Sequence, residues 1–119
     1  MSDTTLGAQQ ELFARLLPRL LDKAHELGFA VRIGEVWRPP QQAAYYASKG
    51  RGILKSRHVD KCAVDLNLFR DGVFLTQTED HAALGAWWVA QHVLARWGGN
   101  FKKRDGNHYS IADPKTGRA

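Results

Sequence analysis

The chain has 119 residues, which is the size of one domain and is enough to bury a hydrophobic core without disulfides. Its single cysteine, Cys62, excludes an internal disulfide, and no stretch approaches the roughly 20 apolar residues that a membrane-spanning helix needs. Seventeen Lys and Arg residues against twelve Asp and Glu residues give a net charge of +5, which favours a polyanionic partner such as nucleic acid, an anionic membrane or an acidic wall polymer.

The first half of the chain predicts a long helix, a strand and a short helix. Apolar residues recur at three- and four-residue steps over residues 6–27, which predicts an amphipathic helix that ends at Gly28. Pro18 lies inside this pattern and predicts a kink or two abutting helices. Residues 29–37 have the β-branched and aromatic composition of a strand, and residues 40–49 have the composition of a helix.

A hairpin is predicted in the middle of the chain. A loop rich in Gly and Lys covers residues 49–56 and leads toward a strand at residues 63–69. This strand is joined to residues 73–75 by Asp71 and Gly72, a pair that tolerates the positive φ angles of a tight turn. The two strands should therefore be antiparallel neighbours.

The last third predicts a helix and a final strand. The helix covers about residues 79–96, residues 100–111 resemble a hairpin or a loop followed by a strand, and residues 113–119 are expected to be a loose tail. Helices on either side of a small antiparallel sheet predict a single α+β domain over residues 1–119.

A carboxylate interrupts the apolar strand at residues 63–69. Strand alternation puts Asp65 on the face opposite the core-facing Val64 and Leu66. Asp is depleted in strands, and a buried ionised carboxylate is costly unless it is paired or bound to a metal. Asp65 therefore needs a partner, either one of the basic residues within 57–61 or a metal ion.

Two histidines could complete a metal site with Asp65. His58 lies seven residues before it, and His108 follows in the sequence "DGNHYS". Zinc prefers imidazole nitrogen and carboxylate oxygen, and a hydrolytic zinc site takes three protein ligands and leaves the fourth position to water. The three residues therefore favour Zn²⁺ as a cofactor. The other histidines lie on predicted helices with no carboxylate at metal-ligand spacing and are expected to be structural: His25, His81 and His92.

Four linked motifs resemble a known family of zinc peptidases. The sequence "SRHVDKCAVD" has the pattern S-x-H-x6-D, and "DGNHY" has the pattern D-x-x-H-Y. "EVWRPPQQAAYY" is similar to a Y-R-T-x-x-Q segment, and "RWGGNFKKRDGNHY" to a W-G-G-D-W segment followed by D-x-x-H-F. Together, over residues 31–109, they resemble the VanY-like D-alanyl-D-alanine carboxypeptidases and, more closely, the L-alanyl-D-glutamate endopeptidases of phage endolysins. The resemblance implies a hedgehog/D-Ala-D-Ala peptidase-like fold.

The resemblance also implies the catalytic roles. His58, Asp65 and His108 would bind zinc, which polarises a peptide carbonyl and lowers the pKa of a bound water to near ~7. Asp105 would be the general base that takes the proton of the attacking water and passes it to the leaving amine. Because Asp-Gly is a common turn pair, a turn without catalytic function is the alternative for Asp105.

Three further residues match positions beside the family's cleft. Arg38 could hold a substrate carboxylate in a bidentate fork, with an ordinary surface arginine as the alternative. Ser56 could donate a hydrogen bond to the substrate or to the metal-site loop. Gln42 matches the motif glutamine, either as a substrate contact or as a structural residue.

The chain departs from the family pattern at three positions without losing a metal ligand. Lys61 stands where the family often has Gly, and could narrow the cleft or add a cationic contact. Asn100 and Phe101 stand where an acidic residue and Trp are usual. Cys62 falls on the core side of the strand, where a buried thiol is expected rather than a catalytic nucleophile.

These features predict a zinc metallopeptidase that cuts peptidoglycan stem peptides at the L-Ala-D-Glu bond, as a phage or prophage lysin. The alternatives are a D,D-carboxypeptidase of the same family and a non-catalytic cell-wall-binding module. We expect a monomer with peptidoglycan as its partner, without nucleic-acid binding or membrane insertion. The first residues lack the basic start and apolar stretch of a signal peptide, so we expect synthesis in the cytoplasm and action on the wall after release.

Overall fold

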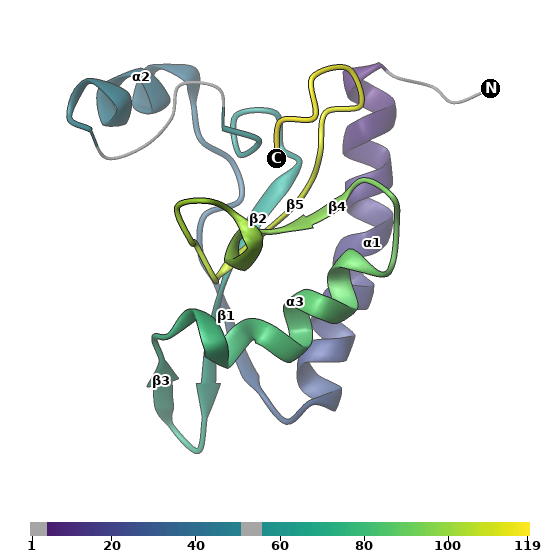
Figure 1. The fold of residues 1–119 in the computed structure, drawn as a ribbon, viewed down its shortest axis with the longest axis vertical. Coiled ribbons are helices and arrows are strands. Elements are labelled where there is room, and N and C mark those ends of the chain that lie inside the picture. Colours follow the sequence, from purple (N-terminus) through teal and green to yellow (C-terminus); the bar gives the residue numbers. More distant parts are fainter. Residues whose placement is uncertain (1–4, 51–55) are drawn as a thin grey trace.

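The computed structural model describes residues 5–50 and 56–119, and this part of the chain forms one antiparallel sheet with helices packed around it (Figure 1). The helices are α1 (Leu6–Glu26), α2 (Pro40–Ser48) and α3 (Ala82–Val89). The strands are β1 (Ala30–Ile33), β2 (Ala63–Arg70), β3 (Val73–Leu75), β4 (Ala95–Trp97) and β5 (His108–Ile111). Two 3-10 turns, η1 (Thr78–His81) and η2 (Gly98–Asn100), complete the described elements. The predicted α+β class is confirmed, and no described helix is long and apolar enough to cross a bilayer.

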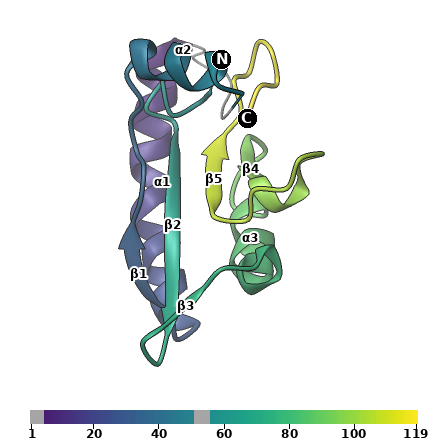
Figure 2. The same cartoon turned by 90° about the vertical axis from the view of Figure 1, so that its left-hand side faces the viewer.

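The helix α1 runs beside β1 (Figure 2) and also contacts β5 and α3. It begins at Thr5, whose hydroxyl accepts a hydrogen bond from the Ala8 N–H at 3.2 Å, and the chain leaves it through Gly28 at φ +90°. Pro18 lies inside one continuous helix, so two abutting helices do not form. The face toward the sheet buries four apolar residues: Phe13, Leu16, Leu20 and Ala24.

The central strand β2 pairs with β1 and β3 toward its C-terminal end and with β5 toward its N-terminal end, in the order β1-β2-β5-β4. Val64, Leu66 and Leu68 are fully buried, whereas Asp65 is only partly buried, as the alternation predicts. The predicted turn is also confirmed, since Asp71 and Gly72 both have positive φ angles, 52° and 79°. The strand therefore presents its polar face away from the core.

The predicted helix over residues 79–96 is wrong in its second half. The helix α3 ends at Val89, and a turn follows in which the N–H of Leu94 donates to Nδ1 of His92 at 3.0 Å. The strand β4 then pairs with β5, placing Ala95 opposite Ile111. Pairing with a strand distant in sequence overrides local helix preference here. His92 consequently lies in a turn and not on a helix.

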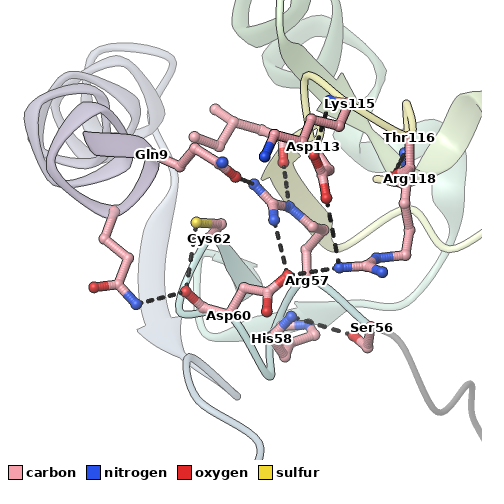
Figure 3. A network of polar contacts seen from close by, with 12 residues as sticks. Gln9, Ser56, Arg57, His58, Asp60, Cys62, Asp113, Lys115, Thr116 and Arg118 are labelled. Atoms are coloured by element: carbon pink, nitrogen blue, oxygen red, sulfur yellow. Dashed lines mark hydrogen bonds and ion pairs between the residues drawn. The ribbon is translucent and has the colours of Figure 1, made fainter. Parts of the chain in front are cut away.

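The other differences are at element ends. The predicted strand at residues 29–37 is shorter, although Gly34 N–H donates to Asp65 O at 2.8 Å and keeps the chain beside β2. The predicted loop at residues 49–56 lies largely outside the described residues. Residues 113–119, expected as a loose tail, form a turn with a 2.7 Å hydrogen bond from Gly117 N–H to Asp113 O. Arg118 joins this turn to Asp60 through a 2.8 Å ion pair (Figure 3).

Candidate active site

The three residues predicted to bind a metal lie together. His58 Nε2 is 3.1 Å from Asp65 Oδ1, and His108 Nδ1 is 3.6 Å from the same oxygen. The two imidazole rings are nearly perpendicular, at 77°, with centroids 5.1 Å apart. One donor atom from each of the three residues lies within 4.8 Å of the others. The arrangement is therefore a compact set of two nitrogens and one oxygen.

The sheet and one loop produce this arrangement. Asp65 on β2 and His108 on β5 are direct partners in the antiparallel register, so their side chains leave the same face of the sheet. His58 comes from the loop between α2 and β2, and its carbonyl accepts a hydrogen bond from the Arg38 N–H at 3.1 Å. Residues from three separate segments are thus brought to one point.

The orientation of the His58 ring is fixed by contacts of Nδ1, the ring nitrogen that does not face Asp65. Its Nδ1 lies 3.2 Å from the carbonyl oxygen of Val36 and 3.7 Å from a carboxylate oxygen of Glu35. A proton on Nδ1 donates to that carbonyl, so Nε2 is the ring nitrogen that faces Asp65. Metal-binding histidines characteristically have a second nitrogen held in this way.

Electrostatics keep the acid of the cluster ionised. Desolvation raises the pKa of Asp65, but the interactions with the nearby His108 and His58 imidazoles outweigh it and bring the pKa down to about 2. Desolvation lowers the pKa of His58, yet its hydrogen bond to Asp65 and the charge of that carboxylate raise it above the ordinary value overall. Asp65 is consequently a carboxylate at neutral pH, as a metal ligand must be.

The donor set fits zinc. Four-coordinate zinc with ligand distances of about 2.0–2.2 Å separates neighbouring ligand atoms by about 3.3–3.6 Å. The two nitrogen–oxygen distances at Asp65, 3.1 and 3.6 Å, come close to this spacing, and all three donor atoms lie within 4.8 Å of one another. Buried His108 Nε2 has no hydrogen-bond partner among the described residues. The three side chains could hold a metal ion.

Asp105 lies in the same cleft as the three donors. Although the residue is exposed, desolvation raises the pKa of its carboxyl above the ordinary value, and the negative charge of Asp65 raises it further. Its backbone is held on both sides: its N–H donates to Gly98 O at 2.9 Å, and its carbonyl accepts from the His108 N–H at 3.1 Å. The residue predicted to be the base is thus fixed relative to one predicted ligand.

The cleft has a volume of about 510 Å³ and includes two of the three predicted substrate-binding residues, Arg38 and Ser56. Nε of Arg38 donates to Glu35 at 3.0 Å and Nη2 donates to the same oxygen, which leaves the Nη1 side of the guanidinium outside this pair. The Ser56 hydroxyl accepts a 3.2 Å hydrogen bond from the His58 N–H, so its present contact is with the metal-site loop.

Gln42 does not line this cleft in the described part of the chain. Its amide on α2 donates to the Tyr46 hydroxyl at 2.6 Å, and the Arg38 guanidinium lies 5.5 Å from the Tyr46 ring centroid. Gln42 thus contacts Tyr46 on its own helix, and its substrate-binding role stays a prediction.

The departures from the family pattern have separate effects. Phe101 lines the cleft and packs on His108, with ring centroids 5.4 Å apart. Lys61 adopts φ +60°, a conformation that favours glycine, and its ammonium lies 5.3 Å from the Trp37 ring centroid rather than in the cleft lining. Cys62 is fully buried in the core, as predicted.

Two contributors escaped prediction from the sequence. Glu35 pairs with Arg38 and approaches His58, but nothing in its local sequence distinguishes it from an exposed strand residue. Gly98 permits the approach of the Asp105 loop, because a Cβ at this position would lie 2.0 Å from Asp105 O and 2.8 Å from His108 Cβ. The double glycine after Trp97 is the available signal in the sequence.

Comparison with known proteins shows a similarity among solved structures. No protein-family model matches the sequence, and no curated protein matches it. Among solved structures, the chain is similar to the crystal structure of the Serratia marcescens L-Ala D-Glu endopeptidase ChiX, with a TM-score of 0.66 and 23% sequence identity. The similarity covers 81% of this chain and 77% of that chain. It establishes a shared fold.

Proposed function

We propose that this chain is a zinc-dependent endopeptidase that cuts peptidoglycan stem peptides at the bond between L-Ala and D-Glu. The observation that carries the proposal is the convergence of His58, Asp65 and His108 within 4.8 Å, in a cleft that also contains Asp105. The shared fold with an L-Ala D-Glu endopeptidase and the four sequence motifs support the choice of bond.

The chemistry divides between the metal and the chain. When bound, zinc would polarise the scissile carbonyl and acidify water at the site. Asp105 would accept a proton from the attacking water and deliver it to the leaving amine, a task that suits a carboxyl whose pKa lies above its ordinary value. Asp65 remains ionised throughout, because its low pKa of about 2 keeps it from competing for that proton.

The charge of the cleft supports an acidic substrate. Its lining includes Arg38 and Lys103, together with Arg104, whose charge is paired with Glu79. Arg38 is pre-oriented by Glu35, so its free edge could bind a substrate carboxylate with little loss of side-chain entropy. Stem peptides carry carboxylates on the C-terminal side of the L-Ala-D-Glu bond, which matches a cleft with cationic side chains in its lining.

The biological setting belongs to the same proposal. We expect a phage or prophage lysin that is made in the cytoplasm and acts on the wall after release. The net charge of +5 supports this setting, since it would hold the enzyme near an anionic wall.

The test is mass spectrometry of muropeptides released from purified wall by the chain after zinc loading, after chelation, and as Asp105→Asn. The proposal predicts new L-Ala C-termini and D-Glu N-termini only with zinc and with Asp105 intact. Release of terminal D-Ala alone would instead indicate a D,D-carboxypeptidase. Wall binding without any new terminus would indicate a binding module.

A further inference from the structure

A second hollow adjoins the cleft on the far side of the Arg104–Asp105 segment. It has a volume of about 350 Å³, and Arg104 and Asp105 line both hollows. The cleft extends to Gly50 at the end of α2, whereas the second hollow is bounded by residues of β3 and η1. In Figure 1 these two regions lie on opposite sides of the loop that leads into β5. A substrate at the metal site could therefore extend into both.

The side chains of the second hollow differ in charge from those of the cleft. Apart from Asp105, its one acidic residue, and Arg104, its polar lining consists of amides, hydroxyls and the buried ring of His81. Arg104 is neutralised locally by a 2.7 Å ion pair with Glu79. The hollow thus offers hydrogen bonds to a neutral ligand rather than attraction for a carboxylate.

Three of these groups are available for a ligand. The side-chain amides of Asn67 and Asn107 and the hydroxyl of Thr78 make no hydrogen bond to the described part of the chain, and each residue is partly exposed. Asn67 lies two positions after Asp65 on the same face of β2. These donors and acceptors therefore begin about 7 Å along the strand from a predicted metal ligand.

An aromatic surface borders these polar groups. Phe74 on β3 stacks on Phe69 of β2, with centroids 5.0 Å apart and an interplanar angle of 22°, and it is 50% exposed. The Arg32 guanidinium lies 4.2 Å from the Phe69 ring centroid and supports the pair. An exposed ring beside amides and hydroxyls suits a pyranose, whose C–H groups pack on the negative face of an aromatic ring while its hydroxyls form hydrogen bonds.

We propose that the second hollow binds an N-acetylated amino sugar of the glycan strand that carries the stem peptide; this inference rests on the proposed function. L-Ala is the residue joined to the sugar, and one extended residue spans about 3.5 Å, so the sugar begins within roughly 10 Å of the cut bond. The cationic cleft takes the acidic C-terminal side of the bond. The neutral hollow takes the opposite side, and the substrate has one orientation across the metal site.

The experiment compares two substrates: a disaccharide-tetrapeptide and the same tetrapeptide with an acetyl group in place of the sugars. We expect the zinc-loaded chain to have a kcat/KM about 10-fold higher for the glycosylated substrate, an effect of the size that one stacked ring and a few hydrogen bonds provide. Phe74→Ala and, independently, Asn67→Ala should lower this ratio toward 1. The control is Val73→Ala, a change beside Phe74 at an exposed position outside the hollow, which should retain the ratio.

The kinetic comparison separates failure of the sugar site from failure of the proposed function. Equal kcat/KM for the two substrates in the unaltered chain would overturn the sugar site and leave the proposed function intact. A sugar preference that persists in both Phe74→Ala and Asn67→Ala would overturn the placement of the sugar in this hollow. Cleavage of neither substrate would count against the proposed function itself, and the inference would fall with it.

Discussion

Two polar clusters meet at the loop between α2 and β2, and they are satisfied to very different degrees. In the first, Arg57 is 1% exposed and every side of its guanidinium has a partner (Figure 3). Its Nε donates to Ile111 O at 2.9 Å, its Nη1 to Asp60 at 2.8 Å and its Nη2 to Gln9 at 2.8 Å. We call this the Arg57 network. It ties the loop to α1 and β5.

The second cluster begins one residue later, at His58. Here two imidazoles converge on a single oxygen of Asp65, and buried His108 Nε2 has no hydrogen-bond partner in the described residues. A saturated buried network serves stability, whereas a convergent set of nitrogen and oxygen donors is what a ligand can complete. The Arg57 network therefore holds in place the loop from which His58 reaches Asp65.

The largest expected effect comes from breaking the reactive cluster at Asp65. Asp65→Asn retains the shape of the side chain but replaces the anionic ligand with a weaker neutral one, so kcat/KM on muropeptides should fall by more than about 10³-fold. The matched control is Asp71→Asn in the hairpin turn, where Asn tolerates the φ of 52° and activity should persist. Equal activity of the two variants would contradict a metal role for Asp65.

A smaller loss is expected when the base is changed and the donors are kept. Asp105→Asn should lower kcat by about 10²–10⁴-fold, the usual contribution of a positioned general base, without altering zinc content. The measurements are steady-state kinetics and zinc analysis of the same sample. A kcat close to that of the unaltered chain would assign Asp105 to the turn alone.

The Arg57 network can be broken separately. Arg57→Ala leaves partly buried Asp60 with one cation fewer and removes three hydrogen bonds, so the free energy of unfolding should fall by about 3–5 kcal/mol in the presence of a chelator. Lys23→Ala removes the surface pair with Glu26 and should cost less than about 1 kcal/mol. Denaturant titration distinguishes the two. Similar losses in both variants would show that the network is not a special source of stability.

The smallest effect concerns pH. Burial lowers the pKa of His81, whose Nδ1 lies 2.7 Å from the Tyr109 hydroxyl, below its unfolded value of 6.5. The unfolded chain therefore binds a proton more readily, and stability from this group is present above pH 6.5 and is lost as pH falls below it. The slope is at most about 1.4 kcal/mol per pH unit.

His81→Gln removes that titration while keeping a side chain able to form a hydrogen bond with Tyr109. The difference in unfolding free energy between pH 7.5 and 5.5, measured with a chelator in the unaltered chain and the variant, isolates His81 from the opposing contribution of His58. The loss at acid pH should be smaller in the variant. Identical losses would remove His81 as a source of acid sensitivity.

The sequence predicted the features whose causes are local or periodic. Alternation in β2 separated Asp65 from the core, and Asp71-Gly72 predicted the hairpin turn because its positive φ angles depend on those two residues. The strand β4 was missed because its partner β5 is distant in sequence. The composition of the residues after Val89 does not indicate that pairing.

The sequence motifs identified those site residues that the motifs themselves contain. His58, Asp65 and His108 were grouped by residue type and resemblance, and they lie together. Glu35 and Gly98 were missed because their functions arise only when distant segments approach. Gln42 shows that a motif match does not fix the position of a side chain, because this residue matches the motif and is not part of the described cleft lining.

The central claim is that His58, Asp65 and His108 bind one ion. The most direct measurement is a zinc titration of the metal-free chain in competition with a chromophoric chelator, for the unaltered protein and for Asp65→Asn. We predict one tight site per chain, with affinity reduced by at least about 100-fold in the variant. No tight site in the unaltered chain, or a site of equal affinity in Asp65→Asn, would contradict the account.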